Sequence, residues 1–419
     1  MQDINGLKVL IGVIVVLLLV AHDGVLSLGL RVNNNPTIIG DQIIPVEINV
    51  FYSNPQLSSP KLFIRGNLSP IMSWNRGLKL EESKLSSGVY QLQFNTTQNQ
   101  LQNIGNLFEF KALINDQDWE IGTNNQFILS LTARNSISIY PWFYQKKGSI
   151  QTLQNVYSPI LQNYRNISLY LPPSYFENQA KTFDNLLIMH DGQNLFDPAT
   201  AFLNQAWMIQ NTLDPLITSM DPSYAMEEII VIGIDNTPDR LNEYTYSKDK
   251  DYGGGKGDLY LDFIEHEVLP YLLAKFSQRW VLRNDKLGIL GSSLGGLISC
   301  YAGWTRSSIY SKIGCMSSSF WWNNQDFNNT ILNRPYTPSN INIYLDSGDS
   351  GDGNDDVIQT QTVTKHILNK GSFKLNQNVY YYLDKGASHN EYYWGRRFHE
   401  PMLALYKKSP LYSKFNRLY

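Results

Sequence analysis

Residues 286–297 constrain this chain more than any other stretch, because they combine a short apolar strand, a tight turn and the start of a helix. The turn has the pattern Gly-x-Ser-x-Gly, with Ser293 at its centre and Gly291 and Gly295 on either side. Glycines at these positions remove side chains that would collide across so sharp a turn. The residues that follow repeat at helical spacing: Leu294, Leu297, Ile298 and Tyr301. Ser293 is therefore a candidate nucleophile, placed before a helix N-terminus whose free N–H groups can stabilise an oxyanion. A strand-helix turn with no catalytic role can have the same pattern, so the catalytic interpretation depends on finding a base and an acid elsewhere in the chain.

Length and composition limit the classes of protein to consider. A chain of 419 residues predicts two globular units. A net charge of -3 argues against a nucleic acid or an anionic membrane as partner. Aromatic residues make up 13% of the chain, which suits either a sugar-facing surface or an aromatic core. Cys300 and Cys315 are the two cysteines, which excludes a fold held together by several disulfides. They form either one disulfide or two buried thiols.

The N-terminal residues 1–29 have the features of a secretory signal peptide. Lys8 precedes an apolar run over residues 9–21, which as a helix would be roughly 20 Å long. A hydrocarbon core of about 30 Å is wider than that, so a signal peptide is favoured over an uncleaved membrane anchor. Four glycosylation sequons also fit passage through a secretory pathway; they are at Asn67, Asn95, Asn166 and Asn328. We therefore expect a secreted protein or one in the secretory-pathway lumen, with membrane anchoring as the alternative.

Residues 36–135 have the pattern of an all-β unit. Short β-branched and aromatic segments alternate with clusters of Gly, Pro, Asn and Ser. The expected strands are residues 46–52, 61–65, 89–94, 107–114 and 127–131. A β-sandwich is the architecture that such short strands predict.

Three segments of this unit resemble starch-binding-type carbohydrate-binding modules: residues 66–74, 108–112 and 118–120. In that family a Trp after the first strand, a Lys in the Phe/Tyr-Lys strand and a Trp before Glu form a sugar-binding surface. The resemblance implies that Trp74, Lys111 and Trp119 contact a glycan, since indole rings stack on pyranoses and a cation bonds their hydroxyls. Residues 89–90 stand where the family often has another Trp. A sandwich that only packs against the next unit is the alternative.

From residue 151 the pattern changes to strands that alternate with helical segments, after a connector predicted for residues 136–150. The expected strands are residues 165–171, 185–189, 229–234, 287–290, 341–345 and 379–383. Residues 260–276 have one apolar face and predict an amphipathic helix. The alternation predicts a mostly parallel sheet with helices on both faces over residues 151–419, with catalytic groups at the carboxyl ends of the strands.

His389 is the predicted general base. In α/β-hydrolases the triad follows the order serine, acid, histidine, so the base should come after Ser293. His366 and His399 fall inside predicted helices, whereas His389 follows the strand at residues 379–383 on a loop. A loop imidazole at the carboxyl end of a strand can accept the proton of Ser293.

The acid is expected in residues 346–356, which follow a predicted strand and contain five aspartates. A calcium loop is disfavoured, because Val357 stands where the Asp-x-Asp-x-Asp-Gly pattern needs a glycine. A carboxylate that orients a histidine usually lies just before the next helix. Asp356 is therefore the first choice, with Asp355 and then Asp352 as alternatives.

Five segments, in their order along the chain, resemble the putative esterase family, the esterase-D-like α/β-hydrolases: residues 190–197, 233–245, 291–295, 319–322 and 386–394. The resemblance implies serine-dependent hydrolysis of carboxylic esters without a metal or an organic cofactor. It also implies that residues 190–193 form an oxyanion loop in which the Gln193 N–H joins that of Leu294. Residues 350–354 lengthen a turn that is shorter in many relatives, which leaves the acid open.

Together these patterns predict a secreted serine esterase that removes acyl groups from a carbohydrate or related ester. A tethered glycan-binding unit would raise the local concentration of such a substrate. A siderophore-type esterase and an acyltransferase on the same triad are alternatives, and so is a non-catalytic glycan-binding protein. Trp207, Trp321 and Trp322 are candidate cleft walls, although each also fits a core. Neither a nucleic acid nor a stable membrane partner is expected.

Overall fold

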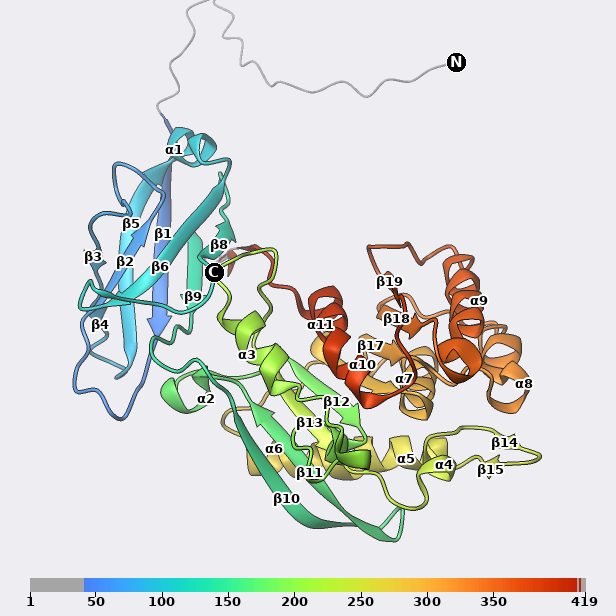
Figure 1. Ribbon diagram of the computed structural model, residues 1–419. Coiled ribbons are helices and arrows are strands. Elements are labelled where there is room, and N and C mark those ends of the chain that lie inside the picture. The colour runs from blue at the N-terminus through green and yellow to red at the C-terminus, as the bar shows by residue number, and fades with distance from the viewer. Residues whose placement is uncertain (1–40, 413, 416–419) are drawn as a thin grey trace, which may run out of the picture.

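A computed structural model describes residues 41–412 together with 414 and 415 (Figure 1). The predicted signal peptide, residues 1–29, lies outside these residues, and so does the alternative membrane anchor. Over the described part of the chain, we find no helix that is long and apolar enough to cross a membrane.

The first unit contains two sheets that enclose one apolar core. One sheet has the order β21 (Lys414–Phe415), β9 (Asn135–Ile139), β1 (Ile43–Phe51), β5 (Val89–Thr97) and β4 (Glu81–Glu82). The other has the order β20 (Leu411–Tyr412), β8 (Asn125–Ile128), β6 (Leu107–Ile114), β2 (Leu62–Gly66) and β3 (Leu78–Lys79), and β7 (Asp118–Trp119) pairs with β6. In β1 every second side chain is buried from Ile44 to Val50, which is the period that places one face of a strand in a core. A short helix, α1 (Gln98–Asn103), follows β5 and begins with a capping box in which Thr97 and Gln100 bond each other's N–H groups.

The second unit is built on one mixed sheet of eight strands (Figure 1). Their order is β10 (Ser149–Ser158), β11 (Asn163–Leu171), β13 (Ile230–Ile234), β12 (Leu186–His190), β16 (Leu287–Ser292), β17 (Lys312–Met316), β18 (Asn342–Gly348) and β19 (Val379–Asp384). The strands from β13 to β19 are parallel, whereas β11 pairs antiparallel with both β10 and β13. The carboxyl ends of the parallel strands therefore meet at one edge of the sheet, where an α/β protein places its functional groups.

Helices cover both faces of this sheet. One face packs against α5 (Gly257–Phe263), α6 (Leu269–Lys275), α7 (Leu294–Thr305) and α9 (Val357–Leu368). The other packs against α3 (Gln210–Thr218), α10 (Glu391–Arg397) and α11 (His399–Tyr406). The shorter elements are α2 (Ser174–Glu177), α4 (Arg240–Glu243), α8 (Trp322–Asp326) and a hairpin of β14 (Lys248–Asp249) and β15 (Gly253–Gly254). Two buried faces explain why the central strands are apolar at nearly every position.

The helix predicted over residues 260–276 is present, and it begins three residues earlier. A π-helical segment (Ile264–Val268) joins α5 to α6, and Pro270 lies in the first turn of α6. Because proline has no N–H to donate, the regular hydrogen-bond ladder cannot pass through it. The wider π turn directly before Pro270 is where the ladder changes.

The two units are joined at both ends of the second one. The Glu177 carboxylate at the end of α2 accepts hydrogen bonds from the N–H groups of Phe143, Tyr144 and Gln145, at 2.6, 2.9 and 2.8 Å. These residues belong to the predicted connector, residues 136–150, whose two ends lie in β9 and β10. At the other end, β20 and β21 return to the first unit and add one strand to each of its sheets.

Candidate functional site

Ser293 lies on a strained turn between β16 and α7. Its backbone has φ 58° and ψ -125°, a conformation that residues with a side chain rarely adopt. The turn is held from the neighbouring strand, because the Ser293 N–H donates to the Met316 carbonyl at 3.0 Å. A Cβ placed on Gly291 would come within 2.7 Å of the Gly295 carbonyl carbon, so the close approach across the turn needs the glycine. The structure thus presents the Ser293 hydroxyl at the carboxyl end of a central strand, directly before a helix.

His389 lies on the loop after β19, where the sequence predicts it. Its Nδ1 is 2.5 Å from the Asp355 Oδ1. An ionised carboxylate can only accept hydrogen bonds, so Nδ1 carries a proton, and in the neutral imidazole Nε2 is the nitrogen with the lone pair. The imidazole also packs edge-on against Trp394, with ring centroids 4.9 Å apart. Since 31% of the side chain is exposed, the ring is reachable by a substrate.

Asp355 is the carboxylate that the structure places on His389. Its side chain is fully buried. The second oxygen, Oδ2, accepts a hydrogen bond from the Ser317 hydroxyl at 2.6 Å and another from the Gly348 N–H. Burial raises the pKa of this carboxyl, but the hydrogen bonds from His389, Ser317 and Gly348 outweigh it and hold the pKa below its ordinary value. An ionised carboxylate is what the His389 ring requires.

Our first choice for the acid, Asp356, is not the partner of His389. It occupies the position before α9 and makes no side-chain hydrogen bond to the helix, and burial raises the pKa of its carboxyl to about 6. Asp352, the last alternative, is exposed in the preceding turn. Residues 354–356 all have positive φ, between 49° and 56°. The backbone of these residues turns the side chain of Asp355 inward, toward the end of β18. The acidic residues of this loop have no periodicity that would show from the sequence which of them points inward.

The segment after β12 packs against the turn of Ser293. His190 ends β12, and a Cβ on Gly295 would lie 3.2 Å from the His190 Cβ. Asp191 follows with φ 54°, and its carboxylate is fixed by Arg240 at 2.7 and 2.8 Å and by Asn236 at 2.6 Å. Burial raises the pKa of Asp191, and the Arg240 guanidinium lowers it to a value below the ordinary one. These contacts fix the loop beside the candidate nucleophile.

The two N–H groups predicted to hold an oxyanion both lie in the first turn of a helical segment. Leu294 is the first residue of α7, and Gln193 lies in the 3₁₀ turn Gly192–Asn194. N–H groups in a first helical turn have no acceptor within the helix. The Gln193 side chain is held in place as well, because its Oε1 accepts the Asn236 N–H at 3.1 Å.

Of the three tryptophans expected as cleft walls, one is exposed. Trp207 and Trp322 are buried in the core, whereas 39% of Trp321 is exposed. Trp321 lies two residues after Ser319, whose Oγ is 3.2 Å from the Ser293 Oγ. Its ring is 5.9 Å from the ring of Tyr252, which is exposed in the turn between β14 and β15. Trp321, one member of an exposed aromatic pair, therefore lies two residues along the chain from Ser319, the residue whose hydroxyl contacts that of Ser293.

In the first unit, the structure separates the three residues expected to bind glycan. Trp74 and Trp119 lie together, with ring centroids 6.4 Å apart, and Trp119 is 41% exposed. The Arg65 guanidinium lies 5.3 Å from the Trp119 ring. Lys111 is 4% exposed, and its Nζ donates to the carbonyls of Glu120 and Gly122 at 3.0 and 2.6 Å. The prediction that Lys111 contacts a sugar is therefore wrong in this structure, because its ammonium group is occupied inside the unit.

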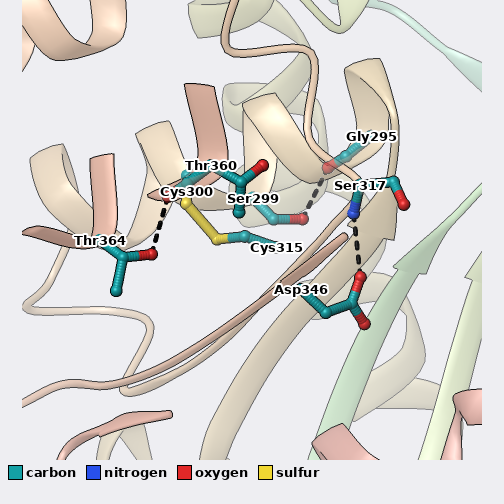
Figure 2. Close-up of a disulfide and its surroundings, with 8 residues drawn as sticks. All are labelled: Gly295, Ser299, Cys300, Cys315, Ser317, Asp346, Thr360 and Thr364. Atoms are coloured by element: carbon teal, nitrogen blue, oxygen red, sulfur yellow. Dashed lines mark hydrogen bonds between the residues drawn. A yellow bond between two sulfur atoms is a disulfide. The ribbon is translucent and has the colours of Figure 1, made fainter. Parts of the chain in front are cut away.

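Cys300 and Cys315 form a disulfide, which decides between the two alternatives that the sequence left open. The bridge joins α7, which begins at the candidate nucleophile, to the neighbouring strand β17 (Figure 2). Both cysteines are buried.

The four sequons differ in how free their side chains are. Asn95 is exposed, but Asn67 uses both ends of its amide, donating to the Leu107 carbonyl at 3.0 Å and accepting the Glu109 N–H at 3.0 Å. Asn166 accepts the Asn155 N–H, and Asn328 donates to the side chain of Asn329. Asn95 is the sequon whose exposure best suits a surface glycan.

Among the described residues, one group of side chains has the spacing of a metal site: Asp262, Glu265 and His266. Arg306 already pairs with Asp262 at 2.7 Å and with Glu265 at 2.8 Å. The Arg306 guanidinium therefore already supplies a positive charge to these two carboxylates.

Three comparisons with known proteins extend these observations. The model of the family described as Esterase, Putative esterase, matches residues 158–405. The uncharacterized protein YbbA of Bacillus subtilis is 26% identical over 256 residues, which cover 58% of this chain and 94% of that protein. A siderophore triacetylfusarinine C esterase of Aspergillus fumigatus is 38% identical over 71 residues, 17% of this chain and 23% of that protein. Among solved structures, the enterobactin esterase FES of Shigella flexneri matches with a TM-score of 0.47 and 12% identity, over 87% of this chain and 93% of that one.

Proposed function

Because this chain belongs to the putative esterase family, we propose that it hydrolyses carboxylic esters with Ser293 as the nucleophile, His389 as the base and Asp355 as the acid. One observation carries this proposal. The buried Asp355 carboxylate lies 2.5 Å from the Nδ1 of His389, and the order serine, acid, histidine along the chain is that of α/β-hydrolases. The strained backbone of Ser293 supports it independently.

The proposed reaction follows from the proton positions. Asp355 keeps the His389 proton on Nδ1, so the Nε2 lone pair takes the proton of Ser293 as its Oγ attacks the ester carbonyl. The imidazolium then gives that proton to the leaving alcohol, which leaves an acyl-enzyme. Water, activated by the same imidazole, attacks the acyl group and regenerates the Ser293 hydroxyl.

The N–H groups of Leu294 and Gln193 are the proposed donors to the negative oxygen of the tetrahedral intermediate. The loop of Gln193 is fixed by the Asp191 contacts to Arg240 and Asn236, so the donor needs no rearrangement during the reaction. One such donor is worth about 3 to 4 kcal/mol of transition-state stabilisation.

For the substrate, we propose an acylated carbohydrate or a related ester. The exposed pair of Trp321 and Tyr252 supports this choice, because aromatic rings stack on the apolar faces of sugars and on aromatic acyl groups. Trp74 and Trp119 offer a second aromatic surface in the first unit, where we place glycan binding without Lys111. The disulfide supports an oxidising compartment, in line with a secreted or lumenal protein.

A siderophore ester is the second candidate substrate. Its support is the 71-residue segment that is 38% identical to a siderophore triacetylfusarinine C esterase. The proposed triad would serve both substrates, since the chemistry at the ester carbonyl is the same.

The test is the release of p-nitrophenol from short-chain acyl esters by the protein and by Ser293→Ala. Turnover that the substitution abolishes supports the serine esterase. Equal turnover in both proteins contradicts it, and glycan binding without turnover in either would indicate a non-catalytic glycan-binding protein. Deacylation of an acetylated polysaccharide, compared with hydrolysis of triacetylfusarinine C, then separates the two substrates. Acyl transfer to an added alcohol in preference to water would identify an acyltransferase.

A further inference from the structure

Ser317 makes a contact that the proposed reaction does not yet use. It is the first residue after β17 and has φ 39°, a strained conformation for a residue with a side chain. Its N–H donates to the Asp346 Oδ1 at 3.1 Å (Figure 2), and its hydroxyl lies 2.6 Å from the Asp355 Oδ2. A strained residue that touches the proposed acid calls for a functional explanation.

The hydrogen bonds around the Ser317 hydroxyl fix the direction of its proton. The Trp394 Nε1 is 3.0 Å from this oxygen, and the Arg397 Nη2 is 2.6 Å from it. An indole N–H and a guanidinium can only donate, so they occupy the two lone pairs of the hydroxyl. The single proton of Ser317 is therefore left to point at Asp355.

These contacts favour the ionised form of Asp355 and leave its Oδ1 available to His389. Its Oδ2 receives the Ser317 proton and the Gly348 N–H, so it acts purely as an acceptor, as an ionised carboxylate does. Its Oδ1 is then available to the His389 Nδ1–H.

Several charged groups face this pair. Arg397 is buried and pairs with Asp346 at 2.9 Å, with Asp355 at 3.6 Å and with Asp384 at 3.6 Å. The carboxyl groups of Asp356 and Glu391 also lie near His389: burial raises the pKa of each, and the charge of His389 lowers it.

We propose that Ser317 is a positioning residue, which holds Asp355 as an ionised acceptor with one oxygen directed at His389. This inference rests on the proposed function, because it assigns a role within the same triad. Ser317 touches neither the substrate nor the reacting atoms, and it acts through Asp355.

The chain offers a matched control in the same loop. The Ser318 hydroxyl is also buried, and among the described residues it has no hydrogen-bond partner. Ser317→Ala and Ser318→Ala therefore remove the same atom from adjacent buried positions, but only the first removes a donor from Asp355.

The experiment measures kcat, KM and the pH profile of kcat/KM for p-nitrophenyl acetate with the full-length protein and both variants, and thermal unfolding checks the fold. Ser317→Ala should lower kcat about 10-fold and leave KM within about twofold. A carboxylate with one donor fewer stabilises the imidazolium more strongly, so the acid limb of the profile should move to higher pH by about half a unit. Ser318→Ala should change neither quantity. If Ser317→Ala does not fold, Ser317→Cys, a weaker donor of similar size, should show a smaller shift in the same direction.

An unmoved acid limb in a folded Ser317 variant overturns the inference, even where kcat falls, because a purely structural role predicts that result. Ser293→Ala is measured beside it. If that variant is inactive and the Ser317 profile is unmoved, only the inference fails. If that variant keeps its turnover, the proposed function fails.

Discussion

Replacing Asp355 by Asn should almost abolish turnover, whereas Asp356→Asn should leave it nearly unchanged. The two residues are adjacent, but only Asp355 contacts His389, at 2.5 Å and without exposure to solvent. The charges of an imidazolium and a carboxylate are delocalised, so we take about 4 Å between their centres, which gives about 4 kcal/mol at an effective dielectric constant of 20 and corresponds to about 10³-fold in rate. The Asn amide can also donate to Nδ1 and so favour the wrong tautomer of His389. We therefore expect kcat/KM to fall between about 10³- and 10⁴-fold.

The assay is p-nitrophenyl acetate hydrolysis at pH 8, with circular dichroism to verify that each variant is folded. Burial raises the pKa of Asp356 to about 6, so its carboxyl is ionised at that pH. Asp356→Asn therefore removes one charge near His389 without removing a hydrogen bond. A change of no more than about threefold is expected for it. Equal losses in the two variants, or a larger loss in Asp356→Asn, would refute the assignment of Asp355.

Four further predictions follow from contacts outside the triad. Arg240→Met removes the cation that fixes the oxyanion loop, so kcat for p-nitrophenyl acetate should fall about 10-fold or more with little change in KM. Lys111→Met leaves two buried carbonyls without their donor, so urea unfolding should show a loss of about 1 to 3 kcal/mol, and glycan binding should not change. The double substitution Cys300→Ser and Cys315→Ser opens a loop of 15 residues and should cost about 3 kcal/mol in the same assay. Burial lowers the pKa of His190 to about 3, so the unfolded chain binds a proton that the folded one does not between pH 6.5 and 3. The free energy of unfolding should therefore fall with decreasing pH across this window, by about 1.4 kcal/mol per unit from this group, and His190→Gln should reduce that slope.

The turn that carries Ser293 and the loop that carries His389 could be predicted because their signals are local. Gly291, Ser293 and Gly295 are close in sequence, and the collision that the glycines avoid arises within the turn itself. His389 follows an apolar strand directly, so its place at the edge of the sheet follows from the strand.

The carboxylate that partners His389 and the surroundings of Lys111 depend on geometry that a sequence does not carry. Asp355 and Asp356 are adjacent acidic residues, and the positive φ of the residues around them decides which one turns inward. Lys111 lies on a strand as expected, but its long side chain reaches two carbonyls inside the unit. Neither outcome follows from residue type or spacing.

Two strands of the large sheet were missed for related reasons. The edge strand β10 is largely exposed, so it lacks the apolar alternation that marks a half-buried strand. The central strand β17 has a lysine at its first position and a glycine at its centre, so it contains few of the large apolar residues that mark a buried strand. Tertiary pairing with β16 and β18, and not local propensity, makes it a strand.

The most direct test of the central claim is covalent labelling of the protein by a fluorophosphonate that reacts with activated serines, read by mass spectrometry of the digested chain. We predict one adduct, on the peptide that contains Ser293, with labelling lost in Ser293→Ala and strongly slowed in His389→Ala. An adduct on another residue, or undiminished ester hydrolysis by Ser293→Ala, would contradict the account.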